Sequence, residues 1–120
     1  MKGTKPSEQP RSAEQSTETA LKKCSLACKE VVALYLSEEE APQTEFGRCL
    51  LRAAAAIDAA ATAIAADADK RSTTFAVAAP LCHAAAEQCR HSGLDPQLLR
   101  TAAACERAAA ICAHHLPRVC

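Results

Sequence analysis

Apolar residues recur at alternating steps of three and four along four separate stretches of the chain. Such spacing brings side chains to one face of an α-helix, so each stretch predicts an amphipathic helix with a narrow apolar stripe. In the first stretch this stripe consists of Leu21, Cys24, Cys28, Val31 and Tyr35. The four predicted helices span about 17–37, 44–69, 72–91 and 95–116.

The remaining stripes are built largely from alanine. The second runs from Phe46 to Ile64, with Cys49 beside it. The third consists of Phe75, Ala78, Cys82, Ala85 and Cys89, and the fourth of Leu98, Thr101, Cys105, Ala108, Cys112 and His115. Because alanine is small and the chain has only 2 Phe, 1 Tyr and no Trp, we expect a thin core and closely packed helices.

Several residues predict where these helices begin and end. Thr44 is suited to cap the second helix, and Asp95 followed by Pro96 is a strong start signal for the fourth. Gly93 fits the position just after the third helix, where a left-handed backbone is common. Pro80 lies inside the third helix, so we expect a kink or a local widening there.

Four periodic helices joined by short connections predict an all-α fold, an antiparallel four-helix bundle. No stretch shows the alternation of a half-buried strand. Residues 1–15 are polar and lack apolar periodicity, so they predict a disordered N-terminal tail. The predicted bundle occupies residues 16–120.

Charge and hydropathy bear on location and partners. The formal net charge is zero, which disfavours a nucleic-acid partner because such proteins carry a basic face. Residues 1–19 lack the apolar run of a secretory signal. The longest stretch without acidic residues, lysine or arginine, 72–86, is too short to span a membrane. These observations predict a cytoplasmic protein with no membrane partner, and they leave a homo-oligomer open.

Eight cysteines dominate the chemistry available to the chain. In a reducing cytosol they are expected to be thiols, which indicates metal or redox chemistry more than a disulfide framework. Cys49 flanks the second stripe and Cys120 is the last residue. The other six lie on the predicted apolar stripes: Cys24, Cys28, Cys82, Cys89, Cys105 and Cys112.

Cys24 and Cys28 are four residues apart, so their Cβ atoms are expected at about 5–6 Å on one helix face. Two thiolates at that separation can bind one metal ion. Thiolate is a soft ligand that selects copper(I) and zinc over hard cations. The pair therefore predicts a metal site for copper(I), with zinc as the competing ion.

The cysteines of the third and fourth helices are seven residues apart within each helix. That spacing corresponds to about 10.5 Å along the axis, too far for one ion to join them. Each needs a partner on a neighbouring helix. With a turn at Gly93, we expect Cys82 level with Cys112 and Cys89 level with Cys105. His115, three residues after Cys112, is a candidate further ligand.

One alternative function stands beside this reading. Free cysteine also packs as a small hydrophobic residue, so the same pattern fits a structural or interaction bundle whose cysteines only fill the core. An enzyme is not expected, since the chain has no Glu-x-x-His, Cys-x-x-Cys, His-Glu-x-x-His, phosphate-loop or Gly-x-Ser-x-Gly motif.

Three segments resemble the cysteine-rich four-helix-bundle copper-storage proteins of bacteria: Lys23–Cys28, Cys82–Cys89 and Cys105–Cys112, together with the loop Arg90–Gly93. The resemblance covers roughly Ala20 to Leu116. It implies a bundle whose core thiolates, Cys49 included, hold copper(I). That family usually places cysteine at every step of three and four. Here alternate positions hold Phe75, Ala78, Ala85, Thr101 and Ala108, so the resemblance implies a reduced capacity.

Overall fold

A computed structural model describes residues 8–64, 68–93 and 95–114. These residues form four helices and no strand. The helices are α1 (Glu8–Tyr35), α2 (Glu45–Ala63), α3 (Ala68–His91) and α4 (Pro96–His114). The all-α prediction is therefore confirmed.

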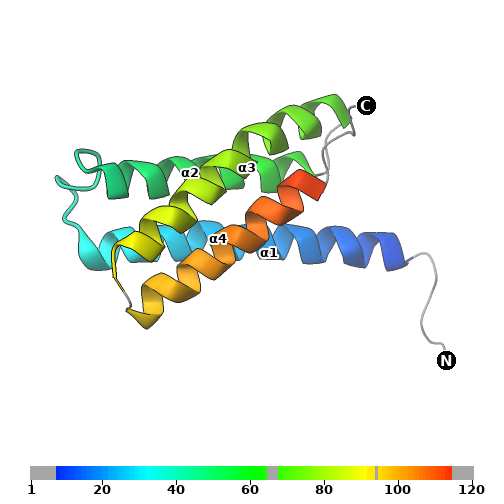
Figure 1. The fold of residues 1–120 in the computed structure, drawn as a ribbon. Coiled ribbons are helices and arrows are strands. Elements are labelled where there is room, and N and C mark those ends of the chain that lie inside the picture. The colour runs from blue at the N-terminus through cyan, green and yellow to red at the C-terminus, as the bar shows by residue number, and fades with distance from the viewer. Residues whose placement is uncertain (1–7, 65–67, 94, 115–120) are drawn as a thin grey trace.

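Consecutive helices run in opposite directions, and the connections α1–α2 and α3–α4 lie at the same end of the molecule (Figure 1). Each helix packs against the next one in the chain, and α4 packs back against α1. The chain is thus an antiparallel four-helix bundle, as the short connections predict. This closed arrangement brings α1 and α4 side by side although they are the two ends of the bundle sequence.

The predicted caps agree with the structure. Thr44 has extended backbone angles, and its hydroxyl accepts a hydrogen bond from the Gly47 amide at 2.9 Å. The Asp95 carboxylate accepts one from the Gln97 amide at 2.8 Å. Gly93 has a φ of 146°, the conformation expected of the residue after a helix.

The helix boundaries differ from the prediction in two places. α1 begins at Glu8 rather than near residue 17, because its first residues favour a helix by propensity although they carry no apolar stripe. Residues 1–7 lie outside the described residues, so the division into tail and bundle stays a prediction. α2 ends at Ala63 and α3 already begins at Ala68, since Asp69 suits the first turn of a helix better than the last.

Pro80 lies within α3, which continues on both sides of it. Its ring nitrogen has no proton to donate to the carbonyl of Ala76, one turn earlier. The proline is exposed, so its ring lies on the outer face of α3. The kink predicted at this position stays a prediction.

The predicted stripes form the core. Leu21, Cys24, Cys28 and Val31 of α1 are fully buried, as are the cysteines of α3 and α4. Tyr35 is the exception, with 42% of its surface exposed. The neighbouring Asp95 carboxylate raises the pKa of Tyr35, and the Tyr35 hydroxyl lowers the pKa of Asp95. Tyr35 therefore lies at the surface, close to the start of α4, instead of entering the core.

Thr101 is the polar residue of the α4 stripe, only 1% exposed. Within the described part of the chain its hydroxyl has no hydrogen-bond partner. A buried unsatisfied hydroxyl costs about 1–3 kcal/mol, and valine has nearly the same shape. We expect Thr101→Val to raise the free energy of unfolding by about 1 kcal/mol in chemical denaturation.

Thr62→Val is the matched control. Thr62 is exposed, and its hydroxyl donates to the Asp58 carbonyl at 3.0 Å. Its replacement should change stability within about 0.5 kcal/mol, as is usual for surface substitutions. Destabilisation by Thr101→Val would mean that the buried hydroxyl has a partner.

Candidate metal centre

The cysteines of α1 and α4 meet in the middle of the core. Cys24 and Cys28 are one turn apart on the buried face of α1, and Cys105 lies opposite them on α4. The Cys28 and Cys105 sulfurs are 3.5 Å apart, and the Cys24 and Cys105 sulfurs 3.7 Å. All three Sγ atoms lie within 4.8 Å of one another, and none of the three residues is exposed.

This trio of Cys24, Cys28 and Cys105 supplies only sulfur. Among the described residues it is the group of cysteine, histidine and carboxylate side chains whose ligand atoms converge closely enough to hold a metal ion. Hard cations such as Mg²⁺ and Ca²⁺ need oxygen ligands, whereas thiolates select soft ions. The arrangement can therefore bind a soft ion away from water, between two helices.

The three thiols share their protons unequally. Cys105, whose sulfur lies 3.5 Å away, and then Cys24 lower the pKa of Cys28 to about 5 although burial opposes this. The contacts with Cys105, Cys28 and Cys82 raise the pKa of Cys24. Cys24 lowers the pKa of Cys105, but the opposite effects of Cys28 and burial are larger together. The pKa of Cys105 is therefore raised. The pKa of Cys28 is thus shifted in the direction opposite to the pKa values of Cys24 and Cys105.

Two more cysteines lie at the end of the trio remote from the α3–α4 turn. Cys82 of α3 also raises the pKa of Cys24, after the larger effects of Cys105 and Cys28, so it lies near the trio. Cys112 of α4 is fully buried, and burial raises its pKa to about 12 with a smaller contribution from Cys82. The thiols of α1, α3 and α4 thus continue past the trio along the bundle axis.

Cys89 and Cys49 extend the same series in the other direction. Burial raises the pKa of Cys89 to about 12, followed by the charges of Cys105 and Cys49. Burial also raises the pKa of Cys49, which unlike the other described cysteines is partly exposed. His115 and Cys120, the remaining sequence candidates, lie outside the described residues.

The sequence prediction does not include the contacts that Cys105 makes with α1. The predicted levels of the α3 and α4 cysteines stay a prediction. The sequence prediction pairs Cys105 with Cys89, and Cys82 with Cys112, from the turn between α3 and α4. Both pairs interact electrostatically, but the sulfur of Cys105 makes its contacts with α1, at Cys24 and Cys28. The reason is that the register between α1 and α4 depends on the closure of the bundle, which no local turn specifies.

Ion pairs on the outer surface hold α3 against α4 at the level of Cys105. Glu106, the next residue, accepts hydrogen bonds from Arg90 and lies 3.1 Å from Nδ1 of His83. Arg90 also pairs with Glu87 at 3.4 Å. His83 faces outward, as its place beside a core cysteine predicts. This network of charged side chains lies on the outer surface beside Cys105. The pattern of apolar stripes does not predict it.

The fold and the site together define a cysteine-rich helical bundle with a buried thiolate centre for a soft metal. The sequence model of the copper storage protein (Csp) family matches residues 10–117, and the chain belongs to this family. The comparison with curated proteins and the comparison with solved structures gave no match. Within the described residues, no helix combines the length and the apolar character needed to cross a bilayer.

Proposed function

We propose that the protein binds copper(I) in the cytosol and sequesters it on its core thiolates, without turnover. The observation that carries this proposal is the convergence of Cys24, Cys28 and Cys105 on one point in the core. Copper(I) accepts a small number of sulfur ligands, and a site made only of thiolates favours it over borderline ions. Cys82, Cys89, Cys112 and Cys49 supply further thiolates on either side.

The capacity is proposed to be low for a storage protein. The described part of the chain contains seven free cysteines. Other stripe positions of α3 and α4 hold Phe75, Ala78, Ala85 and Ala108, all of them buried and without a ligand atom. Ions can therefore bind near the trio, but a continuous metal core along the whole bundle is not available.

The rival function is a bundle whose cysteines only fill the core. Residues that only fill the core need a suitable volume. Nothing requires their sulfur atoms to contact one another across two helices. The sulfur–sulfur distances of 3.5 and 3.7 Å between α1 and α4 favour ligands over filler. Zinc remains the competing ion, because a thiolate set completed by Cys82 also suits it.

Titration of the reduced protein with copper(I) against a competing chelator tests the proposal. We expect at least one copper(I) per chain to resist the chelator, because three buried thiolates bind one ion together. Added copper(I) should also displace zinc from a zinc-loaded sample. Saturation below one ion per chain would support the packing function, and retention of zinc would reassign the site to that metal.

A further inference from the structure

The number of sulfurs in the trio suits a centre that forms three bonds. Among the described residues, the group whose ligand atoms all lie within 4.8 Å of one another consists of Cys24, Cys28 and Cys105. Copper(I) can use two or three such sulfurs. Trivalent arsenic forms three covalent bonds to sulfur, and its lone pair occupies the fourth direction. The trio therefore supplies the complete set of ligands that trivalent arsenic needs.

The spacing of the sulfurs suits a pyramid of three bonds. Two sulfurs bonded to one centre at about 2.3 Å, as in zinc–thiolate sites, lie about 3.5–3.8 Å apart for bond angles of about 100–110°. Arsenic–sulfur bonds have a similar length and angles near the lower of these values. The sulfur of Cys105 lies 3.5 Å from that of Cys28 and 3.7 Å from that of Cys24. A planar centre with three bonds at about 120° would need about 4.0 Å, so these contacts fit the pyramid better.

Burial of the trio favours a complex without net charge. Cys24, Cys28 and Cys105 are fully buried, and the buried polar residues in the described part of the chain, Ser25 and Thr101, are uncharged. A buried charge without a partner is costly. Copper(I) leaves one negative charge on a site of two thiolates and two on a site of three. Trivalent arsenic with three thiolates is neutral, so it needs no counter-ion in the core.

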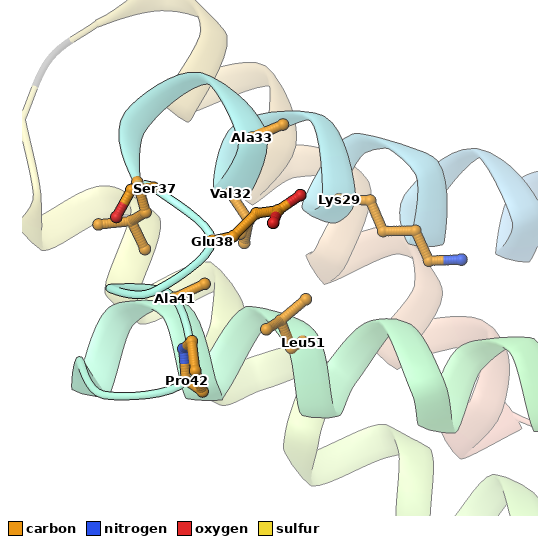
Figure 2. Close-up of a pocket in the computed structure, with 9 residues that line it drawn as sticks. Lys29, Val32, Ala33, Ser37, Glu38, Ala41, Pro42 and Leu51 are labelled. Atoms are coloured by element: carbon orange, nitrogen blue, oxygen red, sulfur yellow. The ribbon is translucent and has the colours of Figure 1, made fainter.

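The thiols of the trio lie in the packed core and not in a hollow of the surface. The hollow of about 340 Å³ between α1 and α2 is lined by residues such as Val32, Ala33 and Leu51, and no cysteine or histidine lines it (Figure 2). Because the trio has no exposed surface, it suits a single atom rather than an organic ligand. Arsenous acid loses its hydroxyl groups as it binds thiols, so only the arsenic atom has to fit.

We propose that the trio also binds trivalent arsenic, taken up as arsenous acid, with one arsenic–sulfur bond to each of Cys24, Cys28 and Cys105. Each of the three steps breaks one arsenic–oxygen bond and one sulfur–hydrogen bond, forms one arsenic–sulfur bond and releases one water molecule. Arsenic stays in the +3 state, so no oxidant or reductant takes part. This inference goes beyond copper(I) binding and depends on the geometry of the trio alone.

Native mass spectrometry of the reduced, metal-free chain with arsenite and excess glutathione tests the proposal without any variant. Glutathione is a monothiol that competes for arsenic, so only thiols that converge on one centre should retain it. We expect one arsenic per chain, with a mass gain of one arsenic atom less three hydrogens. Arsenic on two sulfurs would keep a hydroxyl group and be heavier by one water. That result, or the absence of arsenic, would overturn the proposal.

Two variants locate the arsenic. Cys105→Ala should bind arsenite at least about a hundredfold more weakly, because the third bond of the trio forms within the molecule at a high effective concentration. Cys120→Ser is the matched control, since it also removes one thiol but leaves all seven described cysteines in place. It should bind arsenite as the unmodified protein does. Equal affinity in all three proteins would overturn the trio as the arsenic site.

Copper(I) separates this inference from the proposed function. If both bind at the trio, loading with copper(I) beforehand should block the uptake of arsenic. A chain that retains copper(I) but no arsenic would overturn this inference alone. A chain that retains arsenic but no copper(I) would support this inference and overturn the proposed function, and retention of neither would overturn both.

Discussion

Replacement of Cys105 with alanine is expected to lower the affinity for copper(I) by more than about a hundredfold, beyond the 10–100-fold effect of losing a residue that merely supports a metal ligand. Cys105 is the residue through which α4 meets α1, since its sulfur contacts those of both Cys24 and Cys28. Without it, the α1 pair has no third ligand from the opposite helix.

A double-mutant cycle of Cys28→Ala and Cys105→Ala separates ligand from filler. If the two residues bind one ion together, each single variant and the double variant should lose similar affinity, because the second removal has little left to break. Without metal, each variant should lose only ~1 kcal/mol for a methyl-sized void. Cys112→Ala is the matched control, equally buried on the same helix and outside the trio. Equal copper affinity in all four members of the cycle would contradict the trio.

Gly47→Ala is expected to cause a large loss of stability. An added Cβ at Gly47 would lie 2.1 Å from the carbonyl oxygen of Ala41 and 2.8 Å from its carbon. The obstacle is backbone, so it cannot move aside as a side chain would. We expect the free energy of unfolding to fall by about 3 kcal/mol, the upper end of the range for overpacking.

Hydrogen bonds fix the α1–α2 connection, which contains Ala41. Ser37 and Glu40 exchange hydrogen bonds between backbone and side chain at 2.9 and 3.1 Å, and the Ala41 amide donates to the Ser37 carbonyl at 3.0 Å. Moving Ala41 away from Gly47 would break this turn and expose a residue that is now 6% accessible. Moving the connection to relieve the clash would therefore also lower the free energy of unfolding.

Urea denaturation of Gly47→Ala beside Ala55→Gly measures the effect. Ala55 is exposed in the same helix, so the second variant reports helix propensity alone, about 1 kcal/mol in favour of alanine. If Gly47→Ala stabilises the protein by that amount, the close approach of the α1–α2 connection to α2 does not exist.

Much of the fold follows from local sequence. Steps of three and four specify which face of a helix turns inward, so the burial of Cys24, Cys82 and Cys112 could be predicted one helix at a time. Thr44 and Asp95 specify helix starts because their side chains accept hydrogen bonds from backbone amides a few residues ahead. Such relations involve neighbours in the chain, so they do not depend on the rest of the molecule.

The metal centre was only partly accessible from the sequence. The spacing of Cys24 and Cys28 predicts that they can share an ion, and the structure places them together. Their third partner is 77 residues from Cys28, on a helix that meets α1 only when the bundle closes. Periodicity specifies a face but not the axial register between helices, so the contact of Cys105 with α1 could not be predicted from the sequence.

Sequence by itself thus determined the helices, their inward faces, their caps and the inward direction of the cysteines, because each depends on contacts within a few residues. Tertiary structure alone decided which sulfurs meet, that Tyr35 reaches Asp95 instead of the core, and that Gly47 lies under the Ala41 carbonyl. These last features depend on how far one helix slides along another. That sliding is specified by the packing of all four helices together, and no single segment contains it.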